Sequence, residues 1–229
     1  MPRDNISITR LESGVDPKRP KRRRSREITE EAIYTAAARL FAQNGYPSTT
    51  LEQIAKEVGV HKSTIFHYVT IKDELLAIVL DRGFRGYVES LEQIASSGDD
   101  GATRFESAVR NHLRFVFEHG AELKIFLRER QHLNSDRGRA YLRMKERYEQ
   151  LFTSIVEQGM LDGTLHEGDP TLLCLFVLGA ANSMVEWFRE GGRLSATEVA
   201  NKFVQTVVSP TTTRVLTVVS TLPSPTRPR

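Results

Sequence analysis

The spacing of the apolar residues restricts the fold more than any other feature of this sequence. From Arg26 to Val208 they recur every three or four residues, with charged residues between them, which is the pattern of amphipathic α-helices. No convincing strand pattern interrupts this stretch. The sequence therefore predicts an all-α fold of about nine helices, near residues 26–44, 51–58, 62–68, 72–95, 102–118, 121–132, 136–161, 170–189 and 195–208.

Composition restricts the class of protein to which such a helical chain can belong. Its 229 residues are 39% apolar and 27% charged, as in a soluble globular protein. The most apolar run, 172–181, is about ten residues, whereas a membrane-spanning helix needs about twenty, and the N-terminus lacks the apolar run of a signal peptide. Cys174 is the only cysteine, which excludes an internal disulfide. We expect a cytoplasmic protein without a membrane partner.

Positive charge is concentrated at the N-terminus. Residues 1–26 hold nine lysines and arginines against three acids, and seven of the nine lie in the run PKRPKRRRSR at 17–26. This run has no apolar residue to bury, so we predict a disordered basic arm over 1–25 that binds a polyanion. Solvated disorder, nuclear targeting and an acidic membrane surface are alternatives. The Thr- and Pro-rich residues 210–229 predict a second disordered segment, although 215–219 has strand propensity.

A glycine joins two short helical segments near the N-terminus. Thr50 and Gln53 have the spacing of a capping box, which begins the first segment, and Gly59 ends it. The second segment, 62–68, buries Ile65 and turns small polar residues and a lysine outward. This arrangement is typical of a helix-turn-helix, whose second helix enters the DNA major groove. We therefore predict a DNA-binding head over 26–72.

The polar residues of this head suggest individual DNA contacts. Ser63 and Thr64 are expected at base edges or phosphates, and Lys62 at guanine or phosphate. Residues 27–80 hold four lysines and arginines against seven acids, so the basic arm must supply the general attraction, in the minor groove or at flanking phosphates. The predicted DNA-binding residues are Arg22, Arg23, Arg24, Arg26, Thr50, Lys62, Ser63, Thr64, His67, Tyr68 and Lys72.

The segment from Ile28 to Leu75, with AAARLFAQNGYPSTTLEQIAKEVGVHKSTIFHYVTIKDEL, resembles the DNA-binding head of the tetracycline-repressor (TetR) family. The resemblance implies an all-helical homodimer, usually a repressor, whose C-terminal domain binds a small molecule and thereby releases a double-stranded, palindromic operator. His61, Phe66 and Ile71 depart from the usual residues of the motif. His61 replaces a small polar residue and is added to the predicted phosphate contacts, whereas Phe66 lacks a tyrosine hydroxyl. Thr70 with Asp73 is expected to move the cap of the next helix by one residue.

Residues 73–209 are predicted to form a ligand-binding and dimerisation domain. Residues 126–208, with GAANSMVEWFREGGRLSATEVANKF, resemble the sub-group that senses acyl-coenzyme A thioesters from fatty-acid, steroid or aromatic-acid breakdown. Such an effector needs an apolar tunnel and cations for its phosphates. The candidates are Phe84, Tyr87, Phe115, Phe126, Arg128, Tyr148, Phe152, Phe176, Trp187 and Arg189. The alternatives are that the aromatic residues are simply core, or that the effector is a lipophilic or cationic compound and the regulated gene encodes a multidrug efflux pump.

The segment 170–189 is apolar around nearly its whole circumference, so it must be covered on two sides. A second copy of the chain is the simplest cover for the outer side, although central burial in a monomer gives the same pattern. The predicted dimer interface contains Leu173, Val177, Ala181, Met184, Val185, Phe188 and Phe203. Trp187 is an alternative anchor of this interface.

The sequence offers no catalytic constellation. It lacks a phosphate-cradling glycine loop, a nucleophile elbow and a suggestive pair of carboxylates, so we expect no enzyme activity and no cofactor. His112 and His119 are seven residues apart but lack further obvious ligands, so no metal site is predicted. Two other classes stay open: a DNA-binding architectural protein without an effector, and a helical enzyme or scaffold that matches the head by accident.

Overall fold

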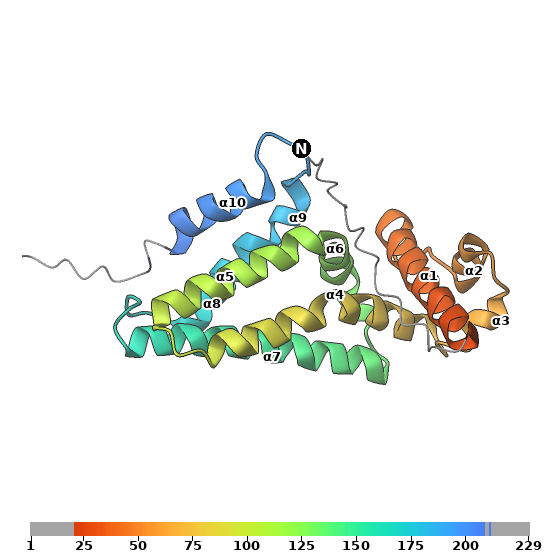
Figure 1. Ribbon diagram of the computed structural model, residues 1–229, viewed down its shortest axis with the longest axis horizontal. Coiled ribbons are helices and arrows are strands. Elements are labelled where there is room, and N and C mark those ends of the chain that lie inside the picture. Colours follow the sequence, from red (N-terminus) through yellow and green to blue (C-terminus); the bar gives the residue numbers. More distant parts are fainter. Residues whose placement is uncertain (1–20, 209–210, 212–229) are drawn as a thin grey trace, which may run out of the picture.

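The computed structural model describes residues 21–208 and Thr211, with side chains from Thr29 onward, and these residues form helices and no strand (Figure 1). The predicted all-α fold is confirmed. The α-helices are α1 (Lys21–Asn44), α2 (Leu51–Val58), α3 (Lys62–Ile65), α4 (Lys72–Ala95), α5 (Gly101–Glu118), α6 (Gly120–Glu129), α7 (Asp136–Leu161), α8 (Pro170–Asn182), α9 (Met184–Trp187) and α10 (Ala196–Phe203).

The predicted start of the first helix was wrong. α1 begins at Lys21, so the last residues of the basic arm predicted over 1–25 continue the helix instead of preceding it. Residues 1–20 lie outside the described part of the chain, as do the side chains of Arg22, Arg23, Arg24 and Arg26. Of the predicted C-terminal tail, Thr211 is described, and its carbonyl oxygen accepts a hydrogen bond from the His166 N–H at 2.9 Å.

Local capping residues set the geometry of the head. The Thr50 hydroxyl accepts a hydrogen bond from the Gln53 N–H and the Gln53 side chain accepts one from the Thr50 N–H, which confirms the predicted capping box of α2. Gly59 ends α2 with φ +76°, a left-handed conformation that glycine adopts without strain. The chain then turns directly into α3.

The third helix is shorter than predicted. α3 ends at Ile65, and the following residues form a turn in which the N–H groups of His67 and Tyr68 bond to carbonyl oxygens three residues earlier. This turn lets both Ile65 and Val69 reach the core. It also leaves the Phe66 ring about half exposed, so Phe66 is not part of that core.

α4 joins the head to the rest of the molecule, which we call the body (α5–α10). It runs without interruption through Gly83 and Gly86. A Cβ atom on Gly83 would lie 2.8 Å from Nδ1 of His119, so this glycine permits close packing at the start of α6. α4 and α7 lie side by side, and α5 packs against both (Figure 1).

Three expected helices of the body are divided. The range 170–189 is broken at Ser183 into α8 and α9, and 195–208 becomes α10 followed by a π-helical turn, Val204–Val208. The range 121–132 becomes α6 and a short 3-10 helix, Arg130–His132. The described residues therefore contain ten α-helices where about nine were expected.

Candidate functional site

α3 and the residues beside it carry five of the polar residues predicted to touch DNA: His61, Lys62, Ser63, Thr64 and His67. Ile65 is fully buried and fixes the helix, whereas Lys62, Ser63 and His67 are exposed and Thr64 is half-buried. His61 precedes the helix, is exposed and makes no side-chain capping bond. This short helix thus presents adjacent hydrogen-bond donors on an accessible surface.

Lys62 has a partner that DNA would have to replace. Its ammonium group forms an exposed ion pair with Glu52 on α2, and this bond lowers the pKa of the Glu52 carboxyl. The same ammonium lies 5.8 Å from the centre of the Phe66 ring. An exposed ion pair stabilises little, so Lys62 can exchange Glu52 for a phosphate or a guanine at low energetic cost.

Two of the predicted DNA-binding residues, Thr50 and Lys72, have partners within the chain. The Thr50 hydroxyl caps α2, and the Lys72 ammonium donates to the carbonyl oxygens of Tyr46 at 2.8 Å and Thr49 at 2.9 Å. Burial lowers the pKa of Lys72. Its Nζ also lies 4.2 Å from the centre of the Tyr46 ring. Lys72 therefore holds the loop before α2 in place, a role that its position in the sequence did not reveal.

The same loop contacts the body. The buried carboxylate of Glu129, at the end of α6, accepts a hydrogen bond from the Tyr46 N–H at 3.4 Å. The His132 ring lies 5.0 Å from the Tyr46 ring, centre to centre. Body residues therefore touch the loop that leads into the helix-turn-helix.

A second contact, between the start of α4 and the body, was also missed. We expected Asp73 to act with Thr70 as a helix cap, but the N-cap of α4 is Ile71 and the Thr70 N–H bonds to Glu74 at 2.6 Å. The Asp73 carboxylate instead accepts from the N–H groups of Asn134 and Ser135 at 2.7 and 2.8 Å and from the Ser135 hydroxyl at 2.9 Å. We call the two contacts together the clasp; its residues are Tyr46, Lys72, Asp73, Glu129, His132, Asn134 and Ser135.

Six of the predicted ligand-binding aromatics lie together where α4 packs against the body. The ring centres of Phe84 and Phe115 are 5.1 Å apart, those of Phe84 and Tyr148 5.0 Å, and those of Tyr148 and Phe152 6.5 Å. We call these residues the aromatic cluster: Phe84, Tyr87, Phe115, Phe126, Tyr148 and Phe152, all buried. Because these rings contact one another closely, they also form part of the hydrophobic core. This is the alternative interpretation that the sequence left open.

A buried histidine supplies polarity beside the aromatic cluster. His112 lies with Nδ1 3.2 Å from the Tyr148 hydroxyl and Nε2 3.0 Å from Oδ1 of Asn182. An amide oxygen only accepts, so Nε2 carries the proton and Nδ1 accepts from the tyrosine. Burial lowers the pKa of His112 to about 4, and the ring is neutral near pH 7.

The other four predicted ligand residues lie elsewhere. Phe176 is 65% exposed and Trp187 is 54% exposed, so neither belongs to the aromatic cluster. Arg128 and Arg189 are also exposed. Trp187 and Arg189 line a shallow surface pocket of about 310 Å³ beside α10. Phe176 and Trp187 therefore do not line the interior with the aromatic cluster, whereas the exposed arginines stay candidates for the phosphates.

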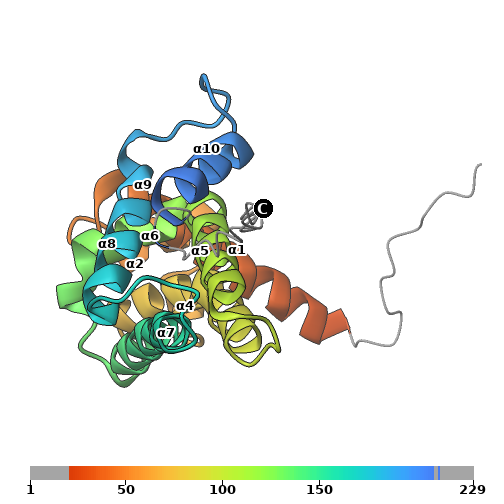
Figure 2. The same cartoon turned by 90° about the vertical axis from the view of Figure 1, so that its left-hand side faces the viewer.

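The predicted dimer residues are largely internal. Val177, Ala181, Met184 and Phe203 are buried within the chain itself, and Leu173, Val185 and Phe188 are partly buried against its core. α8 packs on α5 and α7 with one side, and this packing accounts for the apolar residues of that side only. The uncovered side carries Leu172, Leu175, Phe176 and Trp187, along an outer edge of the body (Figure 2). We call these four residues the outer face of α8 and α9.

The apolar stretch in this region also extends beyond the ten residues, 172–181, noted from the sequence. Pro170–Trp187 has a mean hydropathy of 1.3 over 18 residues, enough by length and composition for a membrane-spanning helix, and 28% of the window is buried. In the fold it forms two helices of the bundle, with Cys174, Val177 and Ala181 packed inside.

Two protein-family models match the chain. "Bacterial regulatory proteins, tetR family" matches residues 33–79, and "Tetracyclin repressor-like, C-terminal domain" matches residues 98–210. The chain belongs to the TetR family. The first match covers the capped helices of the head, and the second covers α5 to α10, so this family accounts for both parts of the molecule. A TetR-family chain is a DNA-binding transcriptional regulator, in agreement with the expectation that it is not an enzyme.

Individual relatives support this assignment. The HTH-type transcriptional repressor KstR2 of Rhodococcus jostii (strain RHA1) is 26% identical over 178 residues, which span 75% of this chain and 85% of KstR2. The structure of the TetR-family regulator PfmR from Thermus thermophilus is similar, with a TM-score of 0.70, 25% identity, and coverage of 77% of this chain and 97% of PfmR. AibR in complex with isovaleryl coenzyme A and operator DNA shares the fold, with a TM-score of 0.70, 23% identity, and coverage of 79% of this chain and 98% of AibR.

Proposed function

We propose that this TetR-family regulator is a homodimeric repressor in the bacterial cytoplasm that leaves a palindromic operator when it binds an acyl-coenzyme A thioester. The observation that carries the DNA-binding part is the exposed donor surface of α3 on a buried, capped support. A helix of this kind reads base edges in the major groove. The similarity to the repressor KstR2 favours repression over activation.

The outer face of α8 and α9 is our reason for proposing a homodimer. Two aromatic and two leucine side chains stand exposed there in one stripe, which is unusual for a surface that stays in water. A two-fold interface can cover this stripe with an identical one from a second copy. The dimer would then present two α3 helices to half-sites about 34–36 Å apart, one turn of the DNA helix.

The aromatic cluster is our reason for proposing an effector with an apolar group that binds inside the body. Its rings would line the space for an acyl group, and the neutral His112 offers a polar partner within it. AibR, which shares this fold, binds isovaleryl coenzyme A. Exposed arginines such as Arg128 and Arg189 are then the candidates for the phosphates of coenzyme A, outside the cluster.

The test starts without an assumed operator. The full-length protein is used to select bound fragments from a random double-stranded DNA library, and the enriched fragment is titrated by fluorescence anisotropy. Isovaleryl-CoA, octanoyl-CoA and a ring-containing acyl-CoA are then added, with free CoA, the matching acids and a cationic dye as controls. We expect an inverted repeat as the enriched sequence and a loss of affinity with one thioester but not with CoA.

Each part of the proposal can fail separately. No enriched sequence would contradict sequence-specific DNA binding, and a single unrepeated half-site would contradict the dimer. If the operator is bound but no thioester weakens it, the acyl-CoA effector is wrong. Release by the dye alone would point to a regulator that senses lipophilic cations, such as one controlling an efflux pump.

A further inference from the structure

Phe66, which directly follows α3, holds its ring out of the core of the head. Within the described residues of the head, 29–71, the aromatic and branched aliphatic side chains are buried or half-buried, except Phe66, which is 49% exposed, and Ile71, which is 48% exposed. The neighbours Ile65 and Val69 are buried and hold the turn after α3 in place. The fold itself therefore directs the Phe66 ring outward.

The ring lies beside the residues of α3 that are predicted to touch DNA. Its centre is 5.8 Å from the ammonium nitrogen of Lys62, and the nearby Ser63 and His67 are exposed as well. α3 lies at the outer end of the head, on the side away from α5–α10 (Figure 1). A DNA surface that reaches Lys62 therefore also covers the Phe66 ring.

A phenylalanine ring recognises a different feature of DNA from the polar residues around it. The ring has no O–H or N–H group to donate to a phosphate or to a base edge. All four bases present hydrogen-bonding atoms in the major groove, but only thymine also presents a methyl group, at C5. Contact between the ring and this methyl group removes apolar surface of both from water and so stabilises the complex. The position of Phe66 thus favours a thymine.

We propose that Phe66 determines part of the operator sequence by packing on the C5 methyl group of one thymine in each half-site. The Lys62 ammonium then leaves Glu52 and binds a neighbouring base or phosphate. Polar contacts alone do not distinguish thymine from uracil, because the two bases have the same hydrogen-bonding atoms, whereas contact with the methyl group does. The inference rests on the proposed binding of α3 in the major groove and adds a base preference to it.

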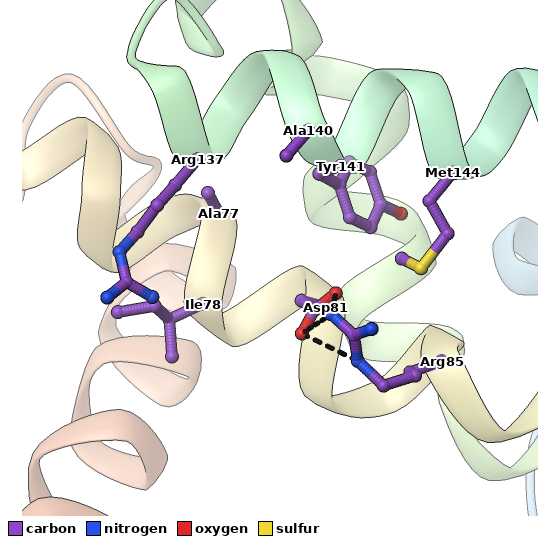
Figure 3. A pocket seen from close by; sticks show the side chains of 8 residues that line it. All are labelled: Ala77, Ile78, Asp81, Arg85, Arg137, Ala140, Tyr141 and Met144. Atoms are coloured by element: carbon purple, nitrogen blue, oxygen red, sulfur yellow. Dashed lines mark hydrogen bonds and ion pairs between the residues drawn. The ribbon is translucent and has the colours of Figure 1, made fainter.

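The test uses the full-length protein and the operator fragment selected from random DNA. Each thymine of a half-site is replaced in turn by deoxyuridine, which keeps the base pair and lacks only the methyl group, and fluorescence anisotropy gives the affinity. The variants are Phe66→Ala and Phe66→Tyr, which keeps the ring. Ile71→Ala is the matched control in the head, because Ile71 is equally exposed. Met144→Ala is the control in the body, because Met144 lines the pocket between α4 and α7 (Figure 3).

We expect one thymine in each half-site at which uracil lowers the affinity of the unmodified protein about fourfold, and about tenfold or more when both half-sites carry uracil. Phe66→Tyr, Ile71→Ala and Met144→Ala should keep this difference, whereas Phe66→Ala should bind the thymine and uracil fragments equally. The inference is overturned if no thymine of the half-site responds to uracil, if Phe66→Ala keeps the full difference, or if Ile71→Ala loses it. A library without any enriched sequence would contradict the proposed DNA binding as well, whereas an enriched sequence that tolerates uracil throughout contradicts the role of Phe66 alone.

Discussion

The head and the body of this molecule place their candidate functional residues differently. In the head, the candidate functional residues stand on the surface of a short helix, and caps at Thr50 and Gly59 fix their position. In the body, most of the aromatic residues proposed for a ligand pack against one another inside the core. A polar residue beside a helix cap is thus informative about function, whereas an aromatic residue at helical spacing is informative mainly about packing.

The largest expected effect tests the packing of the body. Phe152 is fully buried against Phe105 and Tyr148, so Phe152→Ala should lower the free energy of unfolding by about 3–5 kcal/mol. Urea denaturation followed by circular dichroism measures this loss. A loss below about 1 kcal/mol would show that the ring borders an empty ligand space instead of core.

The next test uses the pH dependence of the body. His112 has a pKa of about 4 in the folded protein, against about 6.5 in an unfolded chain. Below pH 6.5 the unfolded state therefore binds the extra proton, and stability falls as the pH drops toward 4, by up to about 3 kcal/mol. His112→Asn should reduce this dependence relative to the unmodified protein in urea titrations at pH 7, 6, 5 and 4.5. An unchanged pH slope in the variant would show that other groups cause it.

The two sides of α8 offer a direct contrast within the body. Phe176 is exposed and the neighbouring Val177 is buried. Phe176→Glu should weaken the dimer about 100-fold without lowering the thermal stability of the monomer, because it places a charge in the interface alone. Val177→Ala should instead destabilise the fold. Analytical ultracentrifugation measures the dimer and thermal unfolding the fold, and a Phe176→Glu variant that stays dimeric at low micromolar concentration would contradict the assigned face.

The clasp connects the two regions. Asp73→Asn replaces a charged acceptor of three hydrogen bonds, so we expect a loss of about 1–2 kcal/mol in stability and a weaker response of DNA binding to the effector. Asp99→Asn, in an exposed loop, is the control. Equal unfolding curves for the two variants would remove Asp73 from the set of residues that hold the head on the body.

The sequence predicted the helices and the capped turn because these depend on neighbouring residues. The range 136–161 and the Thr50 cap agree with the structure for this reason. It did not predict contacts such as Asp73 with Ser135, because the partners are 62 residues apart and their polar side chains fit equally well in local turns. Nor did it separate the two apolar sides of α8, because burial of Val177 and exposure of Phe176 depend on where α5 and α7 lie.

The most direct test of the account is the operator affinity of Lys62→Ala, measured by fluorescence anisotropy on the selected fragment. Lys202→Ala, which removes the same charge from α10, is the matched control. We predict that Lys62→Ala weakens binding about tenfold or more and reduces its salt dependence, whereas Lys202→Ala leaves both unchanged. Equal affinities for the two variants, with both still dimeric, would contradict the placement of α3 on DNA.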